Sequence, residues 1–427
     1  MQGSGSVARS TVGQTVDAAL VESAVRRLEG VAVRTPLQRN LRLSERTGAQ
    51  VWLKREDLQI GRSYKLRGAY NLIAQLDDAA KSAGVVCASA GNHGQGLAYS
   101  CHILGVEGKV FVPRTTPRQK RDRIAALGGK QVTVIVTGDT YDDAAAAALA
   151  EGETTGATMV PAFDDPRTVA GQGTVAVELV EQLGQAPDVL VVPVGGGGLV
   201  AGVATWIAER HPGVRVVGVE PGAAASMAAA FEAGEPVTLP QLDSFVDGAA
   251  VRRVGEVTLP LVQRAGVELM SVPEGLVCSE MLELYQTDGL IAEPAGALST
   301  SALGNGLDVR PGETVVCLLS GGNNDVSRYG EILERSLVYE GLKHYFLVTF
   351  PQEPGALRTF LDEALGADDD ITLFEYVKRN NRETGVALVG IEIGSRDDLD
   401  GLLARMEAAP LDIERIDPSS PEFRYLI

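Results

Sequence analysis

Residues 189–204 read VLVVPVGGGGLVAGVA, in which a largely apolar run precedes four glycines and an alanine-rich amphipathic stretch. Such a run is typical of a strand buried on both faces of a parallel sheet. The glycines let the backbone approach a phosphate closely, and the start of the following helix favours its negative charge. The run matches neither GxGxxG with an acidic ribose ligand nor GxxxxGK[ST], so it favours a monophosphate over a dinucleotide or a nucleoside triphosphate.

The same order of short strand, glycine-containing turn and amphipathic helix recurs from about residue 85 to residue 319. This rhythm predicts βα units around a parallel sheet, and hence an α/β fold. Strands are predicted at residues 51–54, 84–88, 109–112, 131–136, 189–194, 215–219 and 314–319, and helices at residues 118–127, 168–183 and 200–209, among others.

A lysine, Lys65, lies in the segment SYKLRGA at residues 63–69. A single lysine in a sequence is usually a solvated surface charge. It becomes a nucleophile toward an aldehyde when burial or a nearby cation lowers its pKa, an environment that Arg67 and Gly68 permit without establishing it. Lys65 is therefore a candidate nucleophile that needs support from the rest of the chain.

Two further polar loops follow predicted strands. Residues 88–96, ASAGNHGQG, precede a helix expected to start near Leu97, and residues 319–324, LSGGNN, end the strand at 314–319. Each is also compatible with a plain connection, a flexible βα turn in the first case and a serine turn in the second. Because ligands of open parallel sheets collect at the carboxyl ends of strands, these loops, the glycine run and Lys65 can share one crevice.

The rhythm changes after Arg328. A linking helix at residues 331–339 precedes strands at 344–350, 371–378, 386–393 and 412–416, with helices at 357–365 and 397–406. This βαββαβ order predicts a ferredoxin-like sandwich. The predicted organisation is a flexible tail at 1–16, an α/β body at 17–330 with a small subdomain at about 62–160, a linker helix at 331–340 and a C-terminal domain at 341–427.

Composition excludes several classes of protein. A formal net charge of −18, without a basic stripe, argues against a nucleic-acid partner. No apolar run approaches the roughly 20 residues of a membrane span, and the N-terminus does not read as a secretory signal, so we expect a cytoplasmic protein. The four cysteines and four histidines show no paired spacing, which predicts neither a structural disulfide nor a metal site.

Taken in order, SYKLRGAYN, ASAGNHGQG, VGGGGLVAG and SGGNND resemble the fold-type II pyridoxal-phosphate enzymes, and most closely the threonine dehydratases, over roughly residues 31–329. The resemblance implies two parallel-sheet α/β subdomains like those of the tryptophan synthase β chain. The segment YFLVTFPQEPGALRTFLDEAL and the residues after it resemble the ACT-like regulatory domain of the biosynthetic enzymes. The chain has room for one copy of this domain, which resembles the short form of the family. The resemblance also implies a homotetramer.

The resemblance also implies roles for individual residues. Lys65 would hold pyridoxal phosphate as a Schiff base and act as the general base, Asn92 would hydrogen-bond the ring hydroxyl, and Ser320 would face the pyridine nitrogen. The cofactor phosphate would be bound by Gly195, Gly196, Gly197, Gly198 and Leu199, and the substrate carboxylate by Ser89, Ala90, Gly91, Asn92 and His93. A neutral hydroxyl cannot keep the ring nitrogen protonated as an aspartate would, so Ser320 favours elimination.

Two other segments match the family less decisively. Residues 293–297, EPAGA, are similar to a segment near the cofactor ring, and Glu293 is equally compatible with a helix cap. Residues 218–221, GVEP, are similar to a motif that precedes a divalent-cation site in relatives such as serine racemase. Here GAAAS follows, where a second acid would be expected, so no metal is predicted.

The implied activity is conversion of L-threonine, with L-serine as the alternative substrate, to 2-oxobutanoate and ammonia, the first step of isoleucine biosynthesis. Isoleucine would inhibit the enzyme, and valine would oppose the inhibition by isoleucine. The alternatives are a catabolic serine/threonine dehydratase, a β-replacement enzyme such as cysteine synthase, which usually shows an SGNTG-like loop in place of AGNHGQG, and an amino-acid sensor without activity. The C-terminal domain is also compatible with a purely assembling role.

Overall fold

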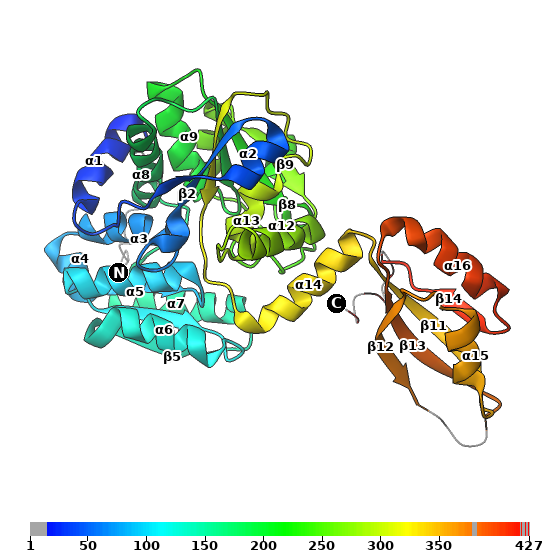
Figure 1. Ribbon diagram of the computed structural model, residues 1–427. Coiled ribbons are helices and arrows are strands. Elements are labelled where there is room, and N and C mark those ends of the chain that lie inside the picture. The colour runs from blue at the N-terminus through cyan, green and yellow to red at the C-terminus, as the bar shows by residue number, and fades with distance from the viewer. Residues whose placement is uncertain (1–14, 378–381, 419, 421–422, 424–425, 427) are drawn as a thin grey trace. The chain divides into compact units, whose positions relative to one another are not determined.

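The computed structural model describes residues 15–377, 382–418, 420, 423 and 426. The chain forms two compact units: a first unit of Met1–Glu274 and Glu283–Asn324, and a second unit of Gly275–Leu282 and Asp325–Ile427 (Figure 1). The second unit thus begins before the expected break at residue 330 and includes a segment from earlier in the chain. The predicted tail at 1–16 lies almost wholly outside the described residues.

The large sheet of the first unit has six strands in the order β1-β2-β10-β7-β8-β9. All neighbours are parallel except β1, which pairs antiparallel with β2. Its strands are β1 (Leu37–Arg39), β2 (Gln50–Arg55), β7 (Val189–Pro193), β8 (Arg215–Pro221), β9 (Glu268–Val272) and β10 (Thr314–Leu319). All residues of β7 are buried, as the apolar run predicted.

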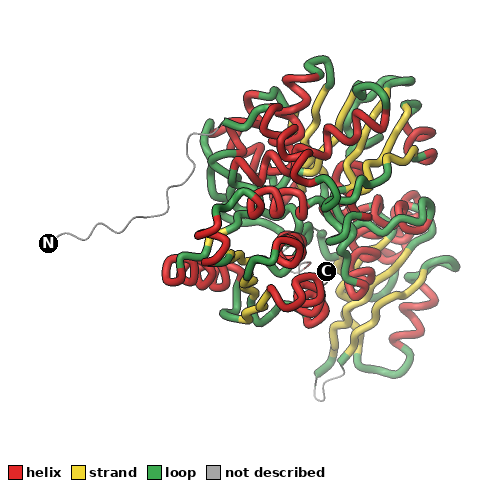
Figure 2. The backbone as a smooth tube through the Cα atoms, turned by 90° about the vertical axis from the view of Figure 1, so that its left-hand side faces the viewer, coloured by secondary structure: helices red, strands yellow, loops and turns green. Residues whose placement is uncertain are grey.

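The small sheet of the first unit has four parallel strands in the order β5-β4-β3-β6. These are β3 (Val85–Ala88), β4 (Gly108–Val112), β5 (Val132–Val136) and β6 (Thr158–Met159). The two parallel sheets confirm the predicted α/β class with two subdomains. Helices flank the strands of both sheets (Figure 2).

The helices of the first unit include α1 (Ala18–Leu28), α2 (Leu41–Thr47), α3 (Lys65–Ala74), α4 (Asp78–Ala83), α5 (Asn92–Leu104), α6 (Arg118–Gly128), α7 (Tyr141–Thr155), α8 (Pro166–Leu183), α9 (Gly198–Arg210), α10 (Ser226–Ala233), α11 (Thr258–Arg264) and α13 (Pro294–Ser301). A further helix, α12 (Glu274–Gln286), is shared between the two units. The main core is built by α1, α8 and α9 against β7. None of the described helices has the length and apolar content of a bilayer-spanning segment.

A buried ionic network fixes α3 against β2 and α8. The guanidinium of Arg67 lies 2.8 Å from a carboxylate oxygen of Glu56 and 2.6 Å from one of Glu178. Lys54 also donates to Glu178 at 2.8 Å. The side chains of Arg67 and Lys54 have no exposed surface, and such charges persist in an interior only when they are paired. The network therefore holds the helix that begins at Lys65.

The second unit contains an antiparallel sheet in the order β12-β13-β11-β14. Its strands are β11 (Lys343–Pro351), β12 (Asp370–Tyr376), β13 (Thr384–Glu392) and β14 (Asp412–Arg415), and its helices include α14 (Tyr329–Tyr339), α15 (Ala356–Glu363) and α16 (Leu399–Ala408). From β11 onward the order is βαββαβ, which confirms the predicted ferredoxin-like domain. Residues 378–381, which include the last residue of the strand predicted at 371–378 and part of the connection to the next strand, lie outside the described residues.

Among the helices that start later in the prediction than in the structure, two follow the glycine-rich loops of the site. Helix α5 begins at Asn92 and not near Leu97, and α9 begins at Gly198 and not at residue 200. The glycines of α5 discouraged a helical prediction because glycine has low helix propensity. In the structure they serve close packing, since a Cβ on Gly96 would lie 2.9 Å from the backbone nitrogen of Leu66 in α3.

Candidate active site

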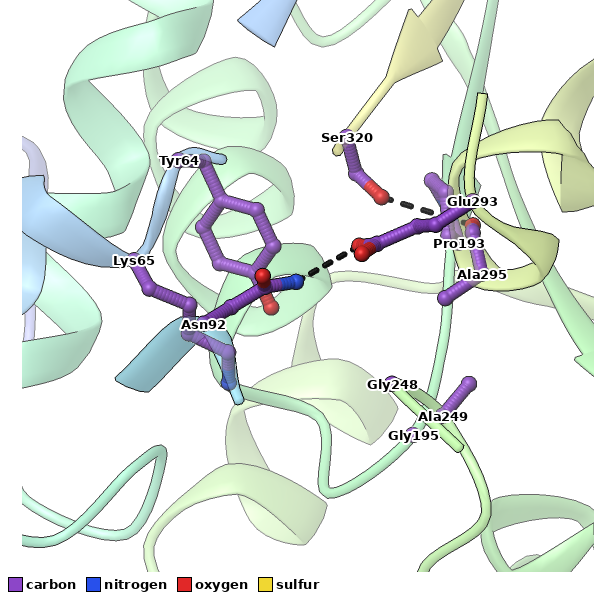
Figure 3. A pocket seen from close by; sticks show the side chains of 10 residues that line it. All are labelled: Tyr64, Lys65, Asn92, Pro193, Gly195, Gly248, Ala249, Glu293, Ala295 and Ser320. Carbon is purple, nitrogen blue, oxygen red and sulfur yellow. Dashed lines mark hydrogen bonds between the residues drawn. The ribbon is translucent and has the colours of Figure 1, made fainter. Parts of the chain in front are cut away.

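A cavity lies in the first unit, near the carboxyl ends of β7 and β10 and the first residues of α3 and α5 (Figure 3). The residues that line it are Tyr64, Lys65, Asn92, Pro193, Gly195, Gly248, Ala249, Glu293, Ala295 and Ser320. The cavity therefore brings together residues from all four sequence motifs.

Lys65 is the first residue of α3 and is half-buried. The backbone around it is attached to the end of β10, because the Tyr64 N–H donates to the Ser320 carbonyl at 3.2 Å and Ser63 forms a β-bridge with Gly321. The Lys65 amine donates to the carbonyl oxygen of Ala162 at 3.1 Å. The chain before Lys65 is thus attached to β10, and the Lys65 amine is held at the cavity by a backbone carbonyl.

Asn92, the first residue of α5, is held by two polar side chains. Its amide nitrogen donates to Glu293 at 2.6 Å, and its amide oxygen accepts from the Asn323 side chain at 2.7 Å. Glu293 is 5% exposed. Burial raises the pKa of Glu293 to about 7, with a further increase from the charge of Asp247.

Glu293 occupies the N-cap position of α13, yet its side chain makes no capping hydrogen bond with the described residues. It points toward Asn92 instead (Figure 3). Of the two readings of this residue, wall of the site or helix cap, the geometry supports the first.

The glycine run leads from β7 into α9. Gly197 has a φ of 92°, which favours glycine, and it caps α9 without any side-chain hydrogen bond from the described part of the chain. Thr258 fixes the turn by donating its hydroxyl to the Gly196 carbonyl at 2.7 Å. The first N–H groups of a helix have no intrahelical acceptor, so this uncapped start is a suitable anion site beside Gly195, which borders the cavity.

Ser320 follows β10 and is 3% exposed. Its hydroxyl donates to the Ala295 carbonyl at 3.3 Å, and its side chain borders the cavity (Figure 3). A hydroxyl has acceptor lone pairs as well as its hydrogen, so it can still contact a ring nitrogen placed there.

The predicted substrate loop divides between two places. Asn92 borders the cavity, whereas Ser89, Ala90 and Gly91 are not among its described lining residues. Ser89 accepts the Gly91 N–H at 3.3 Å, and Gly91 caps α5 with no side-chain hydrogen bond within the described residues. The start of α5 is therefore open to an anion.

His93 lies elsewhere. It is buried, its Nε2 lies 2.7 Å from the Val160 carbonyl oxygen, and it lines a separate cavity with Tyr141 and Met159. Burial and the nearby Lys65 lower the pKa of His93 to about 4. A direct contact between its imidazole and a substrate carboxylate has no support from this geometry.

Other residues of the site carried little sequence signal. Gly248 and Ala249 lie in the irregular segment between α10 and α11, where no strand–turn–helix pattern marks them. Tyr64 and Asn323 belong to recognised motifs but had no assigned role. Glu220, in the GVEP segment, accepts the N–H groups of Met227 and Ala228 at the start of α10. Among the described residues, no group of three or more His, Cys, Asp or Glu is placed to hold a metal ion.

The chain belongs to the pyridoxal-phosphate-dependent enzymes, since the family model "Pyridoxal-phosphate dependent enzyme" matches residues 28–321. A second model, the C-terminal regulatory domain of threonine dehydratase, matches residues 334–426. Within this class the chain is one of the biosynthetic threonine dehydratases. It is 64% identical over 409 residues to the L-threonine dehydratase biosynthetic IlvA of Mycobacterium tuberculosis, with 95% of each chain covered.

Further relatives agree. The corresponding enzyme of Corynebacterium glutamicum is 56% identical over 418 residues, covering 97% of this chain and 96% of its own. Threonine deaminase isoform 2 from Solanum lycopersicum has a similar structure, with a TM-score of 0.70, 35% identity, and coverage of 77% of this chain and 96% of its own. Maize serine racemase also has a TM-score of 0.70, at 27% identity, covering 76% and 99%. The chain is accordingly a lyase that depends on pyridoxal phosphate.

The residues at the cavity fit this cofactor. A half-buried lysine, an uncapped helix start for a phosphate, an amide and a neutral hydroxyl all meet there. These are the chemical groups that an aldehyde, a phosphate, a ring oxygen and a pyridine nitrogen require.

Proposed function

We propose that this chain converts L-threonine to 2-oxobutanoate and ammonia at the cavity around Lys65. The observation that carries the proposal is the convergence of Lys65, Asn92, Gly195 and Ser320 on one cavity, in a member of the biosynthetic threonine dehydratases. When bound, pyridoxal phosphate withdraws electrons from the α-carbon of an amino acid, so that the α-proton becomes removable.

Lys65 tethers the cofactor in the resting enzyme and serves as the general base. With its amine free, Lys65 would accept the α-proton of the substrate as the general base. Its contact with the Ala162 carbonyl, at 3.1 Å, supports this assignment because it orients the amine within the cavity. The β-hydroxyl would leave as water after gaining a proton, and tautomerisation and hydrolysis of the released enamine would give 2-oxobutanoate and ammonia.

The other residues hold the reactants. The backbone from Gly195 to Leu199 would bind the cofactor phosphate at the start of α9, and Asn92 would donate to the ring oxygen. Ser320 meets the pyridine nitrogen without charging it, which favours elimination. The substrate carboxylate binds at the start of α5, where Ser89, Ala90 and Gly91 supply the turn and Asn92 the first residue of the helix. His93 has no contact with the substrate in this proposal, because its imidazole is buried against the Val160 carbonyl.

The second unit supplies regulation. Its βαββαβ fold and the match to the regulatory domain of threonine dehydratase support isoleucine as the inhibitor and valine as its opponent. The enzyme acts at the first step of isoleucine biosynthesis, in the cytoplasm, as a homotetramer. L-Serine is the secondary substrate, because loss of one methyl from a pocket costs only about 1–3 kcal/mol.

The test is production of 2-oxobutanoate from L-threonine by the purified enzyme loaded with pyridoxal phosphate. We expect turnover with L-threonine, weaker turnover with L-serine to pyruvate, and no product without the cofactor. A β-replacement enzyme would be favoured if adding a second nucleophile gave β-substituted products and keto acid formed only in its absence. Binding of L-threonine without turnover would favour the sensor.

A further inference from the structure

Glu293 enters the cavity because a glycine lies opposite it. A Cβ on Gly321, directly after Ser320, would lie 2.1 Å from the Glu293 Oε1 atom. Every other side chain is therefore excluded at position 321 while the carboxyl group keeps its place. The same carboxyl accepts from the Asn92 amide at 2.6 Å and from the backbone N–H of Asn323. A buried acid is thus built into the wall of the site with defined partners.

The partners of Asn92 determine which way its amide points. The Asn323 side-chain nitrogen donates both to the Gly61 carbonyl at 2.8 Å and to the Asn92 oxygen at 2.7 Å. Turning the Asn92 amide over would place two nitrogens together at Asn323 and two oxygens together at Glu293. Amide orientation is assigned from such networks, and here both ends give the same answer. Asn92 therefore turns its nitrogen toward Glu293.

An amide nitrogen carries two hydrogens. One of those on Asn92 is used by Glu293, and the other remains for a ligand in the cavity, which Asn92 itself lines. The group that Asn92 presents is consequently a donor and not an acceptor. A donor at the cofactor's ring oxygen favours the ionised form of that oxygen, since hydrogen bonding to a charged form stabilises it.

We propose that Glu293 is a positioning residue for the cofactor: with Asn323 it fixes the Asn92 amide so that an N–H meets the ring oxygen and favours its ionised state. This inference rests on the proposed contact between Asn92 and the cofactor. It assigns Glu293 no contact with substrate.

The charged groups around Glu293 make its protonation responsive near neutral pH. Asp247, from the loop before α11, raises its pKa, while Lys120 of α6 and the hydrogen bonds from Asn92 and Asn323 lower it, and burial brings the value to about 7. Lys120 and Asp247 are themselves paired at 3.4 Å. An ionised carboxylate accepts a hydrogen bond more strongly than a neutral acid does. The hydrogen bond from Asn92 to Glu293 therefore becomes stronger as pH rises through this range.

The experiment compares the wild type with Asn92→Ala, Glu293→Ala, Glu293→Gln and Glu220→Gln. Two quantities are measured: the dissociation constant of pyridoxal phosphate, and the visible absorption of the bound cofactor between about pH 6 and pH 9. The absorption reports the ionisation of the ring oxygen and does not depend on turnover. Glu220 is the matched control, because it is also buried, with a pKa raised to about 7, yet does not line the cavity.

We expect Asn92→Ala and Glu293→Ala to shift the band in the same direction, and Glu293→Ala to weaken cofactor binding about fivefold, as expected for loss of one hydrogen bond. Glu293→Gln retains an amide oxygen for Asn92, so it restores affinity but removes the pH-dependent part of the shift. Glu220→Gln leaves the band unchanged.

A band that moves in Asn92→Ala but not in Glu293→Ala would overturn the proposal and leave the proposed function intact. A band that moves in neither would show that Asn92 does not meet the ring oxygen, which is a failure of the proposed site. If Glu293→Ala does not fold, Glu293→Gln decides: a pH dependence equal to that of the wild type would contradict a role for the carboxyl.

Discussion

Strand β7 of the first unit and strand β12 of the second unit differ in how far their residues are buried. Every residue of β7 is buried, whereas β12 contains only exposed and half-buried residues. A parallel sheet covered on both faces must place its polar groups at the strand ends, while an antiparallel sheet can leave one face open. The first unit therefore places its polar site residues at the carboxyl ends of buried strands, and the second unit has a partly exposed sheet that is available for binding. Substitutions in the first unit should affect catalysis, and those in the second unit should affect regulation.

The strongest test of this contrast is Lys65→Ala. It removes both the tether of the cofactor and the general base, so we expect turnover of L-threonine to fall at least about 10³-fold. Because Lys65 is half-buried and its amine donates, within the described residues, to a backbone carbonyl, the fold should persist. Keto-acid assays and circular dichroism would measure the two effects. Substantial remaining turnover would mean that another residue carries the proton.

Arg67→Met tests the support beneath the site. The substitution leaves Glu56 without its cation at 2.8 Å and leaves Glu178 with Lys54 alone, and breaking such a network costs about 4 kcal/mol. Thermal or denaturant unfolding should show a large loss of stability in the first unit, accompanied by weaker cofactor binding. The exposed pair Arg118–Asp122 provides the control, where Arg118→Met should change little. Equal effects of the two substitutions would contradict the structural role of the network.

Phe360→Ala makes the corresponding change in the second unit. Phe360 has no exposed surface and packs edge-to-face on Phe350, with ring centroids 5.7 Å apart. Its truncation should cost about 3 kcal/mol through the cavity it leaves. We expect loss of the isoleucine response and a separate, earlier unfolding transition, with turnover in the absence of effector nearly unchanged. A proportional loss of that turnover would show that the two units are not functionally separable.

A smaller effect concerns pH. Burial raises the pKa of Glu220 to about 7, so the folded protein keeps a proton that the unfolded chain has already released. The stability contributed by the neutral acid is present at low pH and is lost as pH rises, by about 2 kcal/mol between about pH 5 and pH 7. Glu220→Gln should flatten this part of the stability profile, measured by denaturant unfolding at several pH values. An unchanged slope would mean that Glu220 remains ionised throughout.

Several features could be predicted from sequence because they depend on neighbouring residues. The bounds of β10 and the βαββαβ order of the second unit follow from local apolar patterns. The helix starts at Asn92 and Gly198 could not be predicted, because glycine's low helix propensity is overridden by close packing of α5 on α3 and by the turn at Gly197. Gly248 and Ala249 reach the cavity only through tertiary folding. The orientation of Asn92 depends on Glu293 and Asn323, which are more than 200 positions away in the chain.

The most direct measurement titrates isoleucine into the L-threonine assay with the full chain and with a chain ending at Tyr339. This end point keeps α14, whose Ser336 contacts Ser279 within the second unit, and removes the antiparallel sheet. We predict that isoleucine suppresses 2-oxobutanoate production by the full chain and that the shortened chain remains active but no longer responds. Inhibition of the shortened chain by isoleucine would contradict the assignment of regulation to the C-terminal sheet and helices.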